Sequence, residues 1–287
     1  MQWTPGGPSD DLEDRRDESG GGGGGLGLGG VHLGIGGTII VGLLSLFFHQ
    51  NLFQLFSGGG PVASAPAGQP DTARDSQEKP EVDFVSFVMD DVQKNWDQIL
   101  PAQTQRPYRH AKLVLYRDEY PSGCGTAQSQ TGPFYCPQDE KVYLDLGFFD
   151  ELKTRFRASG EFAQAYVIAH EFGHHVQKTL GIEQKMRQLQ RQDPEETNAL
   201  SVRLELQADC FAGVWANSTQ QRGIIDRKDV QSALSAAAAV GDDRLQKASR
   251  GTVNPETFTH GTSAQRTQWF RTGLESGRVD ACRTFNR

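Results

Sequence analysis

The segment Tyr166–Gln177 reads YVIAHEFGHHVQ and is the most informative part of the sequence for both fold and chemistry. It contains an HExxH sequence, residues 170–174, in an apolar and helical context. Histidines four residues apart on a helix share one face, about 5–6 Å apart, so His170 and His174 can reach a single zinc ion. Glu171 lies beside that pair, where it can take a proton from zinc-bound water. Two solvated surface histidines are the alternative, which the preceding apolar residues disfavour.

A third protein ligand is needed, because catalytic zinc usually has three protein ligands and one water. A metzincin would carry a glycine and then a histidine where this chain has Gln177 and Leu180, so that extended motif is absent. Glu205 is the better candidate, and Asp209 follows one helical turn later on the same face. One of these two carboxylates can bind zinc while the other orients a ligand histidine through its free N–H. The alternative is a solvated acidic helix face.

The rest of the region from residue 81 to residue 287 predicts one α+β domain. Apolar spacing predicts a helix over residues 84–99 that ends at Pro101. A strand is expected over residues 111–116, and residues 133–136 and 141–146 form a hairpin candidate. Helical patterns dominate the second half, and strands followed by helices are typical of an α+β fold.

The first 80 residues have a different character. Residues 1–30 are acidic and glycine-rich, which predicts a disordered tail. Residues 31–56 carry no charge, and about 20 apolar residues suffice to cross a bilayer, so they predict a transmembrane helix. Residues 57–80 are rich in Gly, Pro, Ala and Ser and predict a flexible linker. A buried core helix, or a signal peptide cleaved near residues 63–65, are the alternatives to a membrane anchor.

The basic residues around this segment predict its orientation. Arg15 and Arg16 precede it and the first basic residue after it is Arg74, which favours an N-terminus inside the cell. We therefore expect a single-pass protein of the cytoplasmic (inner) membrane with an extracytoplasmic domain.

The four cysteines all follow the predicted span, as expected of a domain that folds in an oxidising compartment. Cys124 and Cys136 flank a Gly- and Pro-marked turn, so they are the natural local pair. Cys210 and Cys282 remain for the second bridge. Buried free thiols are the alternative.

The charge balance excludes one class of partner. The formal net charge is −7 at pH 7, and no basic surface is available to bind nucleic acid. The sequence identifies no protein partner.

Three segments resemble a known family. HEFGHH at residues 170–175, ELQADCFAG at 205–213 and GPFYCP at 132–137 look like the bacterial neutral zinc metallopeptidase family of membrane-anchored peptidases. The resemblance covers roughly residues 75–287 together with the N-terminal tail and span. The ELQAD element is also similar to that of the CAAX-protease-like gluzincins, which have several membrane spans where this chain has one predicted.

The resemblance implies a zincin-like domain of the gluzincin type. Its ligands would be His170, His174 and Glu205, with Glu171 as general base and Asp209 behind the ligands.

Two further histidines have separate interpretations. His175 points about 100° away from His174 on the helix, which predicts a structural role. His260 lies in a segment similar to the late histidine-and-arginine segment of the CAAX-protease-like enzymes, which makes it a second candidate catalytic residue. There it would donate a hydrogen bond to the oxyanion beside zinc. Alternatively, it simply precedes a helix that begins near Ser263. Arg266, in the same segment, is a weaker candidate.

These features together predict a zinc-dependent peptidase with one Zn²⁺ per chain, acting on peptides or unfolded proteins outside the cytoplasm. We expect the strand at residues 141–146 to hold the substrate in an extended form. The rival is a non-catalytic, membrane-anchored module with a structural zinc site. Structural zinc usually has four protein ligands, whereas this sequence offers three and a base, which favours catalysis.

Overall fold

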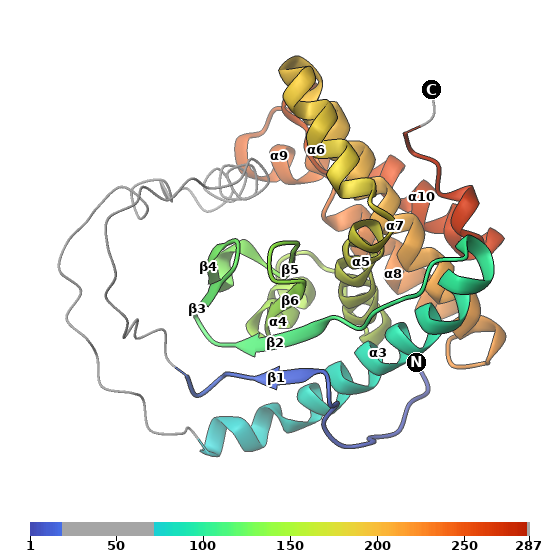
Figure 1. Cartoon of the computed structure of the whole chain (residues 1–287). Helices are drawn as coiled ribbons and strands as arrows, with labels where there is room; N and C mark the ends of the chain where they lie inside the picture. The colour runs from blue at the N-terminus through green and yellow to red at the C-terminus, as the bar shows by residue number, and fades with distance from the viewer. Residues whose placement is uncertain (19–71, 286–287) are drawn as a thin grey trace, which may run out of the picture.

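The computed structural model describes residues 1–18 and 72–285, and its elements are drawn in Figure 1. The strands are β1 (Leu12–Asp14), β2 (Lys112–Tyr116), β3 (Glu119–Ser122), β4 (Gly125–Gln128), β5 (Phe134–Cys136) and β6 (Lys141–Asp145). The helices are α3 (Thr72–Thr104), α4 (Gly147–Thr154), α5 (Glu161–Leu180), α6 (Ile182–Gln192), α7 (Thr197–Gln221), α8 (Arg227–Ala239), α9 (Asp242–Arg250) and α10 (Ser263–Ser276). Short 3₁₀ turns lie at Ser129–Thr131, Pro194–Glu196, Pro255–Thr257 and Val279–Ala281. The mixture of a strand-rich first part and a helical second part agrees with the predicted α+β class.

The main sheet has the strand order β1-β2-β6-β5. β1, β2 and β6 are parallel, and β5 pairs antiparallel with β6, as the hairpin pattern predicted. β6 is therefore hydrogen-bonded on both sides, so the expectation that it holds substrate is wrong. Within the described part of the chain, β5 lies at the end of the sheet. The hairpin β3–β4 is separate and is tied to β5 by the Cys124–Cys136 disulfide.

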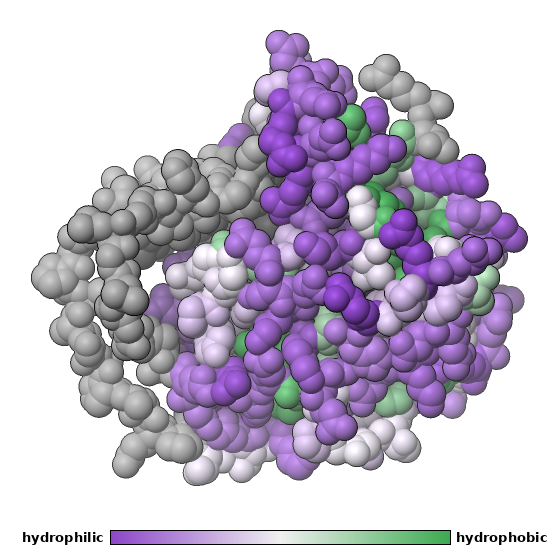
Figure 2. Space-filling model, viewed as in Figure 1, coloured by the Kyte–Doolittle hydropathy of each residue, from purple (hydrophilic) through white to green (hydrophobic). Residues whose placement is uncertain are grey.

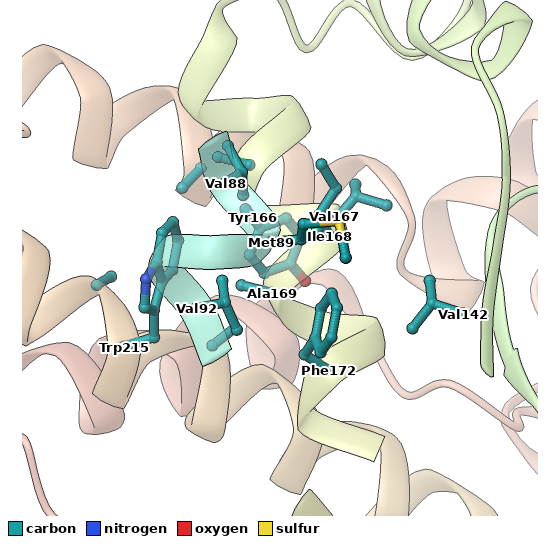
Figure 3. Packing of buried hydrophobic residues seen from close by; sticks show 14 of the residues in the cluster. Val88, Met89, Val92, Val142, Tyr166, Val167, Ile168, Ala169, Phe172 and Trp215 are labelled. Atoms are coloured by element: carbon teal, nitrogen blue, oxygen red, sulfur yellow. The ribbon is translucent and has the colours of Figure 1, made fainter. Parts of the chain in front are cut away.

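Helix α5 occupies the centre of the hydrophobic core. Figure 3 shows Tyr166, Val167, Ile168, Ala169 and Phe172 of α5 among side chains of α3, α7 and β6. Its apolar residues lie on nearly every side because α3, α7, α8 and the sheet all surround it. A helix enclosed in this way holds any polar side chain it carries in a fixed place.

Helix α3 begins earlier than the sequence predicted. Residues 72–80 were assigned to a flexible linker, but they form its first turns. Pairs one turn apart, Arg74 with Glu78 and Lys79 with Asp83, support this exposed part. Arg117 also reaches Glu78 from the end of β2. The folded domain therefore starts at residue 72 rather than 81.

The N-terminal segment, residues 1–18, is part of the domain and not a disordered tail. β1 extends the sheet, and the Met1 ammonium group lies 2.8 Å from an Asp229 oxygen of α8. Trp3 packs against Phe84 of α3, with ring centroids 5.3 Å apart. The acidic composition predicted disorder, but the acidic side chains are paired with basic residues across the sheet, such as Glu13 with Lys141. Residues 19–30 of the predicted tail lie outside the described residues.

This packing bears on the predicted membrane topology. A single crossing between residues 18 and 72 would place β1 and β2 on opposite sides of the bilayer, whereas the two strands are hydrogen-bonded to each other. The predicted arrangement, with the N-terminus inside and the domain outside, is therefore incompatible with the fold. The predicted span at residues 31–56 lies outside the described residues. In residues 1–18 and 72–285, no helix is long and apolar enough to cross a membrane.

Helices α7 and α10 approach each other closely at two glycines. A Cβ atom at Gly273 would lie 1.9 Å from the carbonyl oxygen of Cys210, and one at Gly213 would lie 2.1 Å from that of Phe270. Both positions therefore require glycine. The Cys210–Cys282 disulfide joins α7 to the segment after α10, and both predicted disulfides are thus present. The contact packs the second half of α10 against the middle of α7, and Arg266, nearer the start of α10, lies against Asp209.

The surface of the domain is polar. The face in Figure 2 is mostly hydrophilic, with small apolar areas between the polar ones. Among the described residues, Val253 is the large hydrophobic residue that is clearly exposed, at 43%. Recognition by an extended apolar patch is not indicated on this face.

Candidate metal centre

Two imidazoles and one carboxylate converge between α5 and α7. The ligating atoms of His170, His174 and Glu205 all lie within 4.8 Å of one another. Glu205 Oε2 is 3.3 Å from His170 Nε2, and Glu205 Oε1 is 3.5 Å from His174 Nε2. The close approach depends on Gly173, where a Cβ atom would lie 2.9 Å from the carbonyl oxygen of Ala208. The structure thus brings together the three groups predicted as ligands.

Asp209 lies behind His170, where the sequence placed it. Its Oδ1 is 2.9 Å from His170 Nδ1. An ionised carboxylate only accepts hydrogen bonds, so Nδ1 carries a proton and Nε2 is the ring atom that faces Glu205 and can bind a metal once its own proton is lost. Asp209 therefore fixes the tautomer and the ring orientation that a metal ligand needs.

Arg266 and Tyr166 hold Asp209 from the other side. Arg266 donates from Nε to Oδ2 at 2.8 Å and from Nη2 to Oδ1 at 2.9 Å, and the Tyr166 hydroxyl also donates to Oδ1. Burial alone would raise the pKa of Asp209, but the charge of Arg266 lowers it below its ordinary value. Arg266 is only a weaker candidate from sequence, because no local pattern shows that α10 packs against α7.

Electrostatics at the site favour a positive charge. Burial by itself would lower the pKa of His170, yet the charge and hydrogen bond of Asp209 raise it to about 10. Burial would likewise raise the pKa of Glu205, but the neighbouring histidines, His174 first, hold it well below its ordinary value. A metal cation that binds here replaces the His170 proton, so metal binding releases protons.

Glu171 is buried next to the ligands but is not one of the converging group. It lies near β5, and the backbone of Tyr135 is close enough to act against the rise of its pKa. Burial raises the pKa of Glu171 above its ordinary value of 4.5, although the two histidines oppose this. A buried carboxylate of raised pKa next to a cation site is suited to accept a proton.

The two remaining histidines differ in their surroundings. His175 is buried and bonded on both ring nitrogens, to the Tyr135 hydroxyl at 2.9 Å and to the Arg109 carbonyl at 2.7 Å, so its predicted structural role is confirmed. His260 precedes α10 and is held by Asp242, which accepts from its backbone N–H at 2.7 Å and lies 3.3 Å from its Nδ1. Burial of His260 by itself would lower its pKa, but the charge of Glu205 and the hydrogen bond to Asp242 raise it above the ordinary value.

The donor set fits a catalytic zinc ion. Two imidazole nitrogens and one carboxylate are the usual three ligands of a zinc site with an open fourth position. No further His, Cys, Asp or Glu joins this group within residues 1–18 and 72–285. Among those residues the group has three protein ligands, the number typical of a site with an open fourth position.

The fold and the site agree with the comparison to known proteins. The chain belongs to the family described as "Putative neutral zinc metallopeptidase", whose model matches residues 1–285. Uncharacterized protein YpfJ of Escherichia coli (strain K12) is 46% identical over 294 residues, covering 100% of this chain and 99% of that protein. Uncharacterized protein Rv2575 of Mycobacterium tuberculosis (strain H37Rv) is 45% identical over 202 residues, covering 67% and 66%. No solved structure matches the chain.

Proposed function

We propose that this chain is a zinc-dependent peptidase of the gluzincin type, with His170, His174 and Glu205 as zinc ligands. The observation that carries the proposal is the open group of three ligands with one buried carboxylate beside it, Glu171. Bound zinc supplies the chemistry of its class: it lowers the pKa of a water molecule and polarises a carbonyl group. Family membership supports a hydrolase of this kind.

Glu171 moves the proton in this proposal. It takes a proton from the attacking water and returns it to the leaving amine, for which its raised pKa is suited. His260 is close enough to Glu205 for each charge to shift the pKa of the other, and in this proposal it donates a hydrogen bond to the oxyanion that forms at the scissile carbonyl. Asp242 holds the His260 ring and its backbone in place for this role.

The substrate binds along β5. Tyr135 lies opposite Val142 of β6 on the strand that ends the sheet in the described residues, and its backbone is close to Glu171. An extended peptide that adds to this edge places a backbone carbonyl near the ligands, as in other cases of strand addition. The partners of this function are therefore peptides or unfolded segments of proteins.

We place the domain, including residues 1–18, in an extracytoplasmic compartment. The two disulfides support an oxidising location. The sheet pairing of β1 requires residues 1–18 to share that compartment.

The test compares the full-length wild type with Glu171→Gln and His174→Ala. Glu171→Gln should keep its zinc and its thermal stability while losing nearly all hydrolysis of an unfolded protein mixture. His174→Ala should lose zinc as well as activity. A wild type that holds zinc but cleaves nothing across a broad peptide library would instead support the rival function, a module with structural zinc.

A further inference from the structure

The two ligand histidines are supported in different ways. Behind His170 stands a charged pair, Asp209 with Arg266, whereas His174 has only neutral groups behind it. His174 Nδ1 lies 2.8 Å from the amide oxygen of Gln177, one turn further along α5. Gln177 is 1% exposed, so water does not replace this contact.

A chain of amides continues from Gln177 toward the C-terminus. Gln177 Nε2 donates to the Leu204 carbonyl at 2.7 Å and to Gln207 Oε1 at 3.2 Å. Gln207 Nε2 in turn donates to the Cys282 carbonyl at 2.7 Å. Cys282 is fixed to α7 by its disulfide. We call the two glutamines, together with these two carbonyls, the amide relay.

The relay has a defined direction. Backbone carbonyls only accept hydrogen bonds, so the Leu204 carbonyl requires the nitrogen of Gln177 to face it. The oxygen of Gln177 then faces His174, and Nδ1 of that ring must carry the proton. The lone pair of Nε2 is left pointing at Glu205. The Cys282 carbonyl likewise requires the nitrogen of Gln207 to face it. The oxygen of Gln207 then faces Gln177 and accepts from the second N–H of that amide.

We propose that Gln177 and Gln207 are positioning residues that fix the tautomer and the orientation of His174 for metal binding, and that the disulfide-linked segment at Cys282 anchors them. This inference rests on the metal centre of the proposed function. It makes the affinity for zinc depend on two neutral side chains that touch neither metal nor substrate.

The experiment measures the zinc dissociation constant of the full-length protein by competition with a chelator, and the unfolding temperature of the metal-free protein. Gln177→Met removes the amide at similar length and should weaken zinc binding about 10–100-fold, the range typical of groups behind a ligand. Gln177→Glu keeps an oxygen facing His174 but replaces the amide nitrogen that donates to the Leu204 carbonyl with an oxygen, which that carbonyl repels. It should lower the unfolding temperature while leaving the zinc affinity close to that of the wild type. Gln207→Met should give a smaller loss of affinity than Gln177→Met.

Gln93→Met is the matched control. Gln93 is fully buried on α3, accepts from the Ala111 N–H at 2.7 Å and donates to Asp11 at 3.0 Å, so its loss also breaks two buried hydrogen bonds. It should lower stability and leave zinc affinity unchanged. Wild-type affinity in Gln177→Met, or equal losses of affinity in Gln177→Met and Gln177→Glu, would overturn the positioning role. Absence of peptide cleavage would count against the proposed function but not against the positioning role, because the positioning role is tested by zinc affinity.

Discussion

Replacing Asp209 with asparagine separates its support of the metal ligand from its support of the fold. Asp209 is fully buried and Arg266 has a side-chain exposure of 5%, so the substitution leaves a buried guanidinium without its counter-charge. Breaking one partner of a buried pair costs about 3–5 kcal/mol of unfolding free energy. For a domain of this size, that corresponds to roughly 6–20 °C in the unfolding temperature of the metal-free protein. Zinc affinity should also fall, about 10–100-fold, because His170 loses an anionic acceptor.

The double variant Asp209→Asn/Arg266→Met distinguishes the two effects. Replacing a whole buried pair by uncharged groups is often nearly neutral, so most of the lost stability should return. The zinc affinity should stay low, since the carboxylate behind His170 is still missing. The assay is thermal unfolding of metal-free protein together with chelator competition for zinc. Unchanged zinc affinity in Asp209→Asn, or no recovery of stability in the double variant, would refute the reasoning.

Three other consequences can be checked separately. In intact cells, cysteines introduced at Gly6 and Lys247 should show the same accessibility to an impermeant thiol reagent, and opposite accessibility would contradict the pairing of β1 with β2. His110 bridges Asp11 and Asp97. Burial would lower the pKa of His110, but the two carboxylates raise it above 6.5. The contribution of His110 to the free energy of unfolding is therefore complete below pH 6.5 and is lost as the pH rises through the raised pKa. Hydrogen exchange of residues 1–18, corrected for intrinsic rates, should accelerate over that range in the wild type and lose this trend in His110→Gln. Gly273→Ala should lower the unfolding temperature strongly, because its methyl group meets the Cys210 carbonyl, and an unchanged temperature would contradict the helix contact.

The group of candidate ligands was predictable from sequence because it depends on residues that are close together along the chain. Helical spacing alone places His170 beside His174 and Glu205 beside Asp209. The structure adds only that Gly173 lets α7 come close enough for the two pairs to meet. The cysteine pairs were predictable for a similar reason, since one local pair determines the other.

The parts that the sequence missed depend on contacts between distant segments. Composition predicted a disordered tail, but β1 is ordered by strand pairing and by ion pairs with residues about a hundred positions away, such as Lys112 for Asp11. Gln177 was noted only as a position that lacks the metzincin glycine. Its role depends on Gln207 and on the C-terminal segment, whose position no local pattern reveals.

The central claim is an open zinc site with three protein ligands. Zinc-edge X-ray absorption of the full-length protein, loaded with one zinc per chain, tests it most directly. The spectrum should show two histidine nitrogens, one carboxylate ligand and one exchangeable solvent oxygen, and it should be the same in Glu171→Gln. Four protein ligands in the wild type, or a first coordination sphere that changes when Glu171 is replaced, would contradict it.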